Sequence, residues 1–257
     1  MSDEQTELVR RLRADPTALC RVVQGLLTLP ESADGSGLSD DRLAERNTRP
    51  ATNILNRALE LDRSDLAVQR TQAKRVVGTC RHFAVLATAF LRAAGVPARA
   101  RCGFACYFHP PKKLDHWITE YWSENEARWI RIDSEILGLS VVSRAEDLAP
   151  GEFLTGGEAW QQVRSGASDP CDFGVWGTAN WGPGEIRGNV LRDLAALVKL
   201  EMLPWDEWGP MENSYKGRTG ADFDNQIDTV AAVCGGENLA LIRSTYEKFA
   251  VPEDLLQ

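Results

Sequence analysis

Hydrophobic positions in the N-terminal third of the chain recur at helical spacing. Over residues 4–29 the apolar side chains fall three or four positions apart, with a break near Asp15, which predicts two helices. The polar stretch 31–37 indicates a flexible loop, and residues 38–74 resume the helical pattern. Nothing in residues 1–70 points to chemistry, so we interpret this range as a helical N-terminal part.

The pattern changes after Gly78, where a buried helix and several strands are expected. Residues 80–94 carry apolar or small side chains at nearly every core-compatible position and are followed by Gly95, which favours a stop. Beyond it, apolar and polar residues alternate in the manner of strands. The expected strands cover residues 98–108, 116–122 and 128–133, the last two joined by a polar turn at 123–126. We assign the core to residues 71–140.

The C-terminal range 141–257 is less regular. Residues 149–188 are rich in Gly, Trp and Pro without a long period, which predicts mostly loop with a short helix. Helical stripes are clearer over residues 190–203 and 238–250. We therefore expect a loop-rich and helical extension that packs on the core.

Composition and charge narrow the classes of partner. Hydrophobic residues make up 43% and charged residues 26% of the chain, as in ordinary globular proteins. A net charge of -8 argues against nucleic acid and anionic membrane surfaces as partners. The charged N-terminus lacks the apolar stretch of a signal peptide, and no run is long enough to span a bilayer. We expect a cytoplasmic protein whose six cysteines are reduced thiols.

Cys80 lies where the buried helix is expected to begin. A helix N-terminus and a neighbouring imidazole both favour a thiolate, which is the nucleophilic form of cysteine. Gly78 leaves room for the backbone, and the small Thr79 leaves the sulfur uncrowded. The placement fits a nucleophile, although a buried structural thiol is the ordinary alternative for a single cysteine.

The expected hairpin supplies a base and a carboxylate. In an antiparallel pair, opposite residues have numbers that add to a constant, and a turn centred near residues 124 and 125 gives a sum of about 249. His116 and Asp133 fit this sum and should lie side by side. The carboxylate would orient the imidazole, whose other nitrogen faces the thiol.

These segments, GTCRHFAVLATAFLRAAGVPARARCGF, DHWITEYW and RWIRID, resemble the core of bacterial transglutaminase-like proteins over residues 71–137. The resemblance implies a papain-like α+β fold, in which a helix bearing the cysteine packs on an antiparallel sheet bearing the histidine and aspartate. It also implies acyl transfer through a thioester without a cofactor: Cys80 attacks an amide or thioester, His116 moves the proton, and Asp133 holds His116.

Two further features accompany the resemblance. The pieces GEAW and IRGNVLRDLAALVKLEMLPWDEWG resemble a C-terminal extension of one poorly characterised bacterial subgroup. His82 stands where many relatives carry aspartate, and its two-residue step from Cys80 turns it away from the thiol, which predicts a structural role. Candidate oxyanion donors are the Cys80 backbone N–H and the side chain of Gln72.

Other residues have a plain and a functional interpretation. Trp117, Trp160 and Arg101 are candidate substrate-binding residues. The plain alternative is packing in the core for the tryptophans and exposure to solvent for the arginine. Asp115 is expected to be a turn or surface group. Cys102 and Cys106 with the nearby His109 are not expected to form a metal site. Residues four positions apart on a strand lie about 13 Å apart and cannot share one small ion.

The leading hypothesis is therefore an acyltransferase or an amide or thioester hydrolase that acts on a small molecule or a peptide. One alternative is a ring-closing or elimination enzyme of specialised metabolism that uses the same thiol and base. Another is a non-catalytic binding module, against which the complete set of Cys80, His116 and Asp133 argues.

Overall fold

The computed structural model describes residues 1–30 and 38–256, so the loop expected at 31–37 lies outside the described residues. The chain divides into two compact units. The first comprises Met1–Ala100 and Ile118–Leu148, and the second comprises Arg101–Trp117 and Ala149–Gln257. The ranges 1–70 and 71–140 thus fall mostly in the first unit, and 141–257 mostly in the second.

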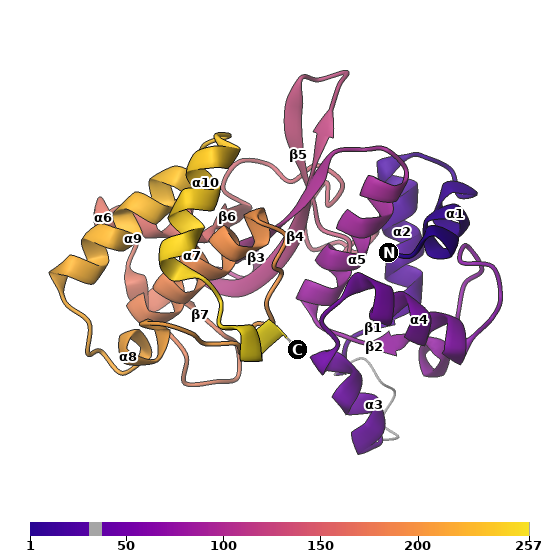
Figure 1. Ribbon diagram of the computed structural model, residues 1–257, viewed down its shortest axis with the longest axis horizontal. Helices are drawn as coiled ribbons and strands as arrows, with labels where there is room; N and C mark the ends of the chain where they lie inside the picture. The colour runs from indigo at the N-terminus through magenta and orange to yellow at the C-terminus, as the bar shows by residue number, and fades with distance from the viewer. Residues whose placement is uncertain (31–37, 257) are drawn as a thin grey trace. The chain divides into compact units, whose positions relative to one another are not determined.

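In the first unit, three helices surround the helix that carries Cys80. The first unit contains the helices α1 (Asp3–Arg10), α2 (Pro16–Leu26), α3 (Asp40–Ala44), α4 (Ala51–Leu61) and α5 (Cys80–Ala93). Helices α1, α2 and α4 pack against α5, whose apolar positions are almost all buried (Figure 1). The break near Asp15 is confirmed, because its carboxylate caps α2 by accepting a hydrogen bond from the Ala18 N–H at 2.8 Å. The helical pattern over 38–74 is shorter than expected, since α4 ends at Leu61.

The strands confirm the α+β class. They are β1 (Leu27–Thr28), β2 (Val76–Val77), β3 (Ala98–His109), β4 (Lys112–Ser123), β5 (Arg128–Ile132), β6 (Phe153–Thr155) and β7 (Phe173–Gly174). The larger sheet has the order β5-β4-β3-β6, and β7 pairs with β4. The β4–β5 and β3–β6 pairs are antiparallel, while the short β1–β2 and β4–β7 pairs are parallel. Strands β3 and β4 each contribute residues to both units.

The register of β4 with β5 differs from the prediction by two residues. Thr119 lies opposite Ile132 and Trp122 lies opposite Trp129, so paired numbers add to 251 rather than 249. The centre of the turn therefore lies one residue later in the chain than expected. Within the turn, Ala127 adopts a left-handed backbone conformation with φ of 51°. Direct pairing of His116 with Asp133 is therefore wrong. A shift of two still keeps both residues on the face that was expected.

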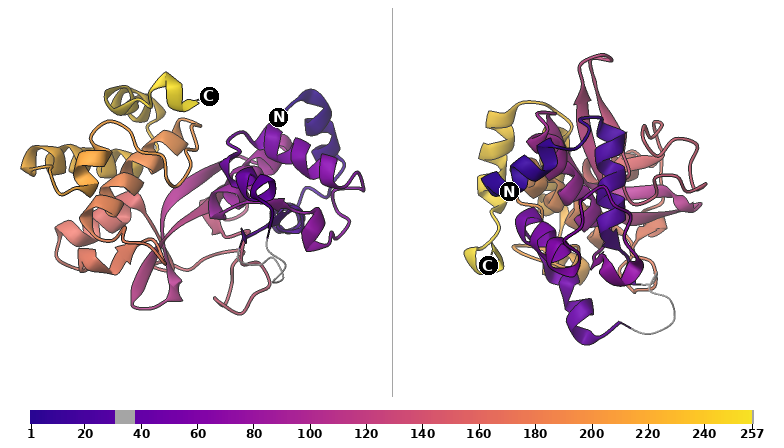
Figure 2. Two further views of the ribbon diagram at one scale, coloured as in Figure 1. Left: turned by 90° about the horizontal axis from the view of Figure 1, so that it is seen from below. Right: turned by 90° about the vertical axis from the view of Figure 1, so that its right-hand side faces the viewer.

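The second unit is more helical than the sequence predicted. Its helices are α6 (Gly156–Arg164), α7 (Pro183–Leu197), α8 (Met211–Tyr215), α9 (Ala221–Cys234) and α10 (Leu239–Tyr246). Helices α6, α7 and α9 pack against one another (Figures 1 and 2). The prediction of mostly loop with a short helix over 149–188 agrees with α6 but missed β6 and the first turns of α7, and the helix expected at 190–203 begins and ends earlier. The helix near 238–250 is confirmed in α10, although its α-helical part ends at Tyr246.

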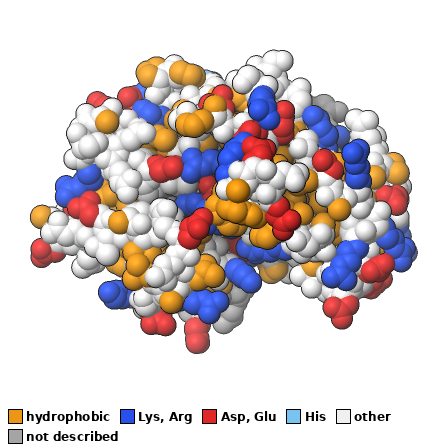
Figure 3. Space-filling view, turned by 90° about the horizontal axis from the view of Figure 1, so that it is seen from above, with side chains coloured by type: hydrophobic (Ala, Val, Ile, Leu, Met, Phe, Trp, Pro, Cys, Tyr) orange, Lys and Arg blue, Asp and Glu red, His pale blue; other side chains and the backbone are white. Residues whose placement is uncertain are grey.

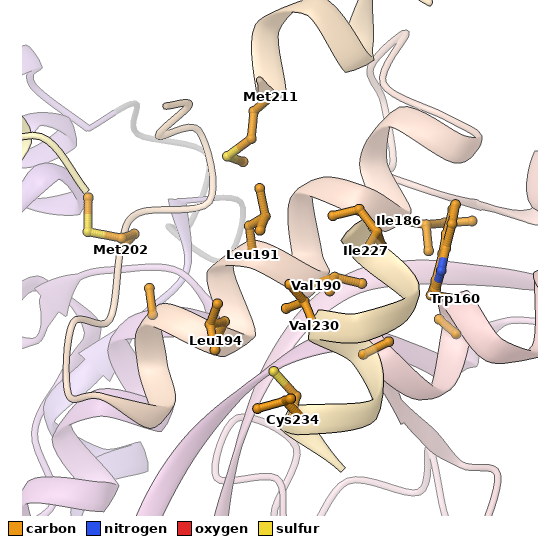
Figure 4. Close-up of a cluster of buried hydrophobic side chains, with 14 of the residues drawn as sticks. Trp160, Ile186, Val190, Leu191, Leu194, Met202, Met211, Ile227, Val230 and Cys234 are labelled. Atoms are coloured by element: carbon orange, nitrogen blue, oxygen red, sulfur yellow. The ribbon is translucent and has the colours of Figure 1, made fainter. Parts of the chain in front are cut away.

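The first turns of α7 escaped the sequence pattern, because the helix is buried on nearly all sides. Its apolar residues join a hydrophobic cluster with α6 and α9, in which Trp160 lies beside Ile186 (Figure 4). Its polar residues are equally buried, and Asn189 and Asp193 have no exposed surface. A helix that buries polar side chains shows no clean apolar stripe, so periodicity alone does not find it.

The surface carries mixed charge. Positive and negative side chains are interspersed on the face shown in Figure 3 rather than gathered by sign. Within the described ranges 1–30 and 38–256, every helix is too short or too polar to cross a membrane.

Candidate active site

Cys80 is the first residue of α5 and remains partly exposed, whereas the residues that follow it in the first two turns are buried. The predicted helix start is therefore confirmed. Gly78 is needed two residues earlier, because a Cβ atom there would lie 2.8 Å from the His82 Cβ. Gln72, the weaker oxyanion candidate, is exposed in the short 3-10 turn Gln72–Lys74.

His82 caps the helix that carries Cys80. Its side chain is fully buried, and its Nδ1 accepts a hydrogen bond from the Thr79 backbone N–H at 3.1 Å. This places an imidazole in the role that a glutamate or glutamine usually fills at the third helical position. The structural role predicted for His82 is confirmed, and the detail that the sequence did not reveal is that the ring fixes the first turn beneath the thiol.

The buried position of His82 makes stability depend on pH. Burial, with a smaller effect of the Arg81 charge, lowers the pKa of His82 from 6.5 to about 3. The unfolded chain takes up a proton below pH 6.5, whereas the folded chain keeps the ring neutral until about pH 3. As the pH is lowered from 6.5 to about 3, the free energy of unfolding should therefore decrease, by up to about 1.4 kcal/mol per pH unit.

This dependence can be isolated with His82→Asn, which retains an acceptor for the Thr79 N–H. Urea unfolding of the wild type and the variant at several pH values should give a shallower decline in the variant, because asparagine does not titrate. Parallel declines in the two proteins would show that His82 is not the responsible group.

Asp133 directly follows β5 and is fully buried. Its Oδ1 accepts a hydrogen bond from the Glu135 N–H at 3.0 Å, and its own N–H donates to the Ala145 carbonyl at 2.9 Å. Continuing the β4–β5 register by one residue places Asp133 opposite Ile118. The carboxylate is thus held by local backbone contacts on the segment that leaves the sheet.

His116 lies on β4 in the second unit and is 3% exposed. Two aromatic side chains contact its ring edge-on: the centroid of Tyr107 lies at 6.2 Å and that of Phe108 at 5.2 Å. Both are partly exposed at the end of β3. The sequence analysis missed these two residues, although their place at the end of a strand, just before the Pro-Pro turn, was a usable signal.

The expectation that Asp115 is a turn or surface group is wrong. Its side chain is turned toward α7, where it accepts a hydrogen bond from Asn189 Nδ2 at 2.8 Å. Burial raises the pKa of this carboxyl, partly offset by the charge of Arg192. Neighbouring residues on a strand point to opposite faces, so Asp115 and His116 project to the two sides of β4.

The three candidate substrate-binding residues are buried within their unit. Trp117 is 1% exposed, and Trp160 is 2% exposed, with its Nε1 donating to Asp228 at 2.7 Å. Arg101 is 3% exposed and forms two hydrogen bonds with Asp193, at 2.9 and 2.7 Å. The solvated position expected for Arg101 is therefore wrong, and packing accounts for both tryptophans without a substrate.

The other thiols differ from Cys80 in their surroundings. Cys102 is buried and donates to Asn189, while His109 stacks on Trp176 at a centroid distance of 4.1 Å. Burial raises the pKa of Cys106 to about 11, and a hydrogen bond with Asp169 raises that of the exposed Cys171. These two thiols are natural references for the reactivity of Cys80.

A pocket of about 360 Å³ lies elsewhere in the second unit, at the start of α7. Trp181, Arg187, Ser214 and Tyr215 are among its lining residues. The Arg187 side chain is already paired with Asp224 at 2.7 Å. None of the candidate catalytic or substrate-binding residues lines this pocket.

Helix α5 and the antiparallel strands define an α+β protein with a partly exposed cysteine at the start of a buried helix. Residues 47–134 match the family model of the transglutaminase-like superfamily. The chain is also similar to a crystal structure of a candidate cysteine protease from Cytophaga hutchinsonii, with 17% identity and a TM-score of 0.35. That match covers 60% of this chain and 40% of the other, so the chain spans less than half of that protein. No curated protein matches the sequence.

Proposed function

We propose that this protein catalyses acyl transfer, or amide or thioester hydrolysis, through a thioester on Cys80. The observation that carries the proposal is a partly exposed cysteine as the first residue of a buried helix, within the segment that matches the transglutaminase-like family model. The dipole of a helix N-terminus stabilises a thiolate there. A cysteine that served only to pack would be more stable inside the core.

The contacts of β4 with the α5 region support a role for His116 beside Cys80. The Thr119 hydroxyl donates to the Ala84 carbonyl at 3.0 Å, and the Trp122 N–H donates to the Pro97 carbonyl at 2.8 Å. Strand β4 therefore advances in the same sense as α5. His116 precedes the first of these contacts on β4, and Cys80 precedes it on α5.

Asp133 completes the proposed set. Ile118 and His116 are two residues apart on β4 and share a face, and Asp133 lies opposite Ile118 in the continued register. A diagonal neighbour on the same face of a sheet is about 7–8 Å away between backbone positions, which suits a carboxylate and an imidazole. Asp133 would thus hold the ring of His116 from the side.

The mechanism assigns one task to each residue. The Cys80 sulfur attacks the carbonyl carbon of a small-molecule or peptide amide or thioester, and the bond from that carbon to the leaving nitrogen or sulfur breaks. His116 accepts the thiol proton and returns it to the leaving group. An amine or water then attacks the thioester carbon and loses a proton to His116. The bond from that carbon to the Cys80 sulfur breaks, the product leaves, and Cys80 is regenerated. Asp133 keeps the imidazole oriented and stabilises its charged form.

Acylation of Cys80 is the direct test. Treatment with a thioester probe and analysis by intact-mass and peptide mass spectrometry should give one acyl adduct, located on Cys80. The Cys80→Ala variant should give none, and Cys106→Ala should behave as the wild type, because burial raises the pKa of that thiol to about 11. An adduct that persists in Cys80→Ala, or that forms on no cysteine, rejects the proposal.

Alkylation by iodoacetamide near neutral pH provides a second measurement. We expect Cys80 to react at least about tenfold faster than Cys171, because an activated thiol has a larger thiolate fraction. Cys171 is exposed and so has the steric advantage. Equal rates would show that Cys80 is not activated.

A further inference from the structure

One buried amide joins three elements beside His116. Asn189 of α7 has no exposed surface, and its Nδ2 donates both to the Gly103 carbonyl of β3, at 3.1 Å, and to Asp115 of β4, at 2.8 Å. Its Oδ1 accepts from Arg192 at 3.0 Å and from the Cys102 thiol at 3.3 Å. All the hydrogen-bonding capacity of the amide is therefore used.

The orientation of this amide is fixed by its neighbours. Arg192 only donates, so it must face the oxygen of Asn189, and the nitrogen must then face the two acceptors on the strands. Arg192 is itself held by Glu185 at 3.2 Å and by the Tyr215 hydroxyl at 3.1 Å. The backbone of α7 comes so close to α6 at this level that a Cβ on Gly156 would lie 2.5 Å from the Asn189 carbonyl oxygen.

The strand end that this amide binds is the one that carries His116. Asp115 is the preceding residue, and a displacement of its backbone moves the histidine on the opposite face of β4. The imidazole is 3% exposed and packs against Tyr107 and Phe108, so it has little freedom to compensate by changing its own rotamer.

We propose that Asn189 is a positioning residue for His116, which it fixes by binding Asp115 on β4 and Gly103 on β3 to helix α7. This inference rests on the proposed function, in which His116 is the base. The raised pKa of Asp115, caused by burial, is consistent with a carboxyl whose task is to accept this one hydrogen bond rather than to meet solvent.

The test uses Asn189→Ala in the full chain, with two measurements. The first is the acylation rate of Cys80 at saturating thioester probe, together with the probe concentration that gives half the maximal rate. We expect the maximal rate to fall on the order of a hundredfold, because a misplaced catalytic group loses alignment, while the half-saturating concentration changes little.

The second measurement does not depend on activity. The chain has three histidines, so the imidazole C–H signals in an NMR spectrum can be assigned with single His→Gln variants. In Asn189→Ala the His116 signals should move, because the ring shifts relative to Tyr107 and Phe108, and those of His82 and His109 should stay in place. Asp115→Ala, which removes the other partner of the bond, should move the same signals.

Tyr215→Phe is the matched control. It removes the hydrogen bonds of the Tyr215 hydroxyl with Arg192 and Glu185 and leaves the Asn189–Asp115 bond intact. It should leave the maximal rate and the His116 signals unchanged. An Asn189→Ala protein with the wild-type rate and signals overturns the proposal, as does an equal loss of rate in Tyr215→Phe. If the wild type forms no acyl adduct, the proposed function fails, and the NMR signals alone decide whether Asn189 positions His116.

Discussion

Replacing His116 by alanine should slow acylation of Cys80 by between about a hundredfold and ten-thousandfold, the range found for general acid–base groups. The loss is expected because the proposed base both removes the thiol proton and protonates the leaving group. The measurement is a single-turnover rate with a thioester probe, read by intact mass. Added imidazole should restore part of the rate, since a small base can occupy the space that the side chain leaves.

His109→Ala is the control for this experiment. His109 belongs to the same unit but stacks on Trp176 at the exposed end of β3. Its removal should change the acylation rate by less than about twofold, as expected of a surface substitution far from the chemistry. A His116→Ala protein that retains more than a tenth of the wild-type rate would contradict the assignment of His116 as the base.

Asp133→Asn refines the same prediction. The amide can still accept the Glu135 N–H bond, so the local turn is preserved. It removes the negative charge that stabilises an imidazolium, and it can favour the wrong tautomer of the ring. The acylation rate should therefore fall while the folded structure stays intact, a combination that a purely structural Asp133 would not produce.

The sequence was most informative where a short-range pattern decides the structure. The small residues before Cys80 and the apolar run after it predict that a helix begins at this residue. Helix α5 does begin at Cys80. The prediction that His116 and Asp133 share a face rests on strict alternation, which survives an even error in register. The predicted sum of 249 is wrong, because the turn includes Ala127 in a left-handed backbone conformation. Alanine is not one of the residues that mark such a position in a turn sequence.

Long-range burial of polar groups could not be predicted in the same way. The sequence pattern predicts a solvated strand residue at Arg101, but its side chain is paired with Asp193, which lies 92 residues later in the chain. The buried polar residues Asn189 and Asp193 interrupt the apolar stripe of α7, so the sequence pattern predicts the second half of the helix but not its first turns. The site is therefore encoded locally, whereas the support behind it depends on partners that only the fold brings together.

Breaking the ion pair of Arg101 and Asp193 is the most destabilising single substitution that we expect in the second unit. Arg101→Ala leaves a fully buried carboxylate without its cation, and breaking a buried pair in this way costs about 3–5 kcal/mol. The Cys102 N–H also donates to Asp193 at 3.0 Å, but a single neutral donor does not replace a guanidinium that binds both oxygens. Urea unfolding followed by tryptophan fluorescence should show the loss as a lower midpoint.

Arg128→Ala is the matched control, because Arg128 also binds both oxygens of an aspartate, Asp147, at 2.9 and 2.7 Å. The difference is exposure: the Arg128 side chain is 44% exposed, so its loss should cost less than about 1 kcal/mol. The double variant Arg101→Met with Asp193→Leu should recover most of the stability lost in Arg101→Ala, since no charge remains buried. If the double variant is no more stable than Arg101→Ala, packing at these positions rather than the unpaired charge causes the loss.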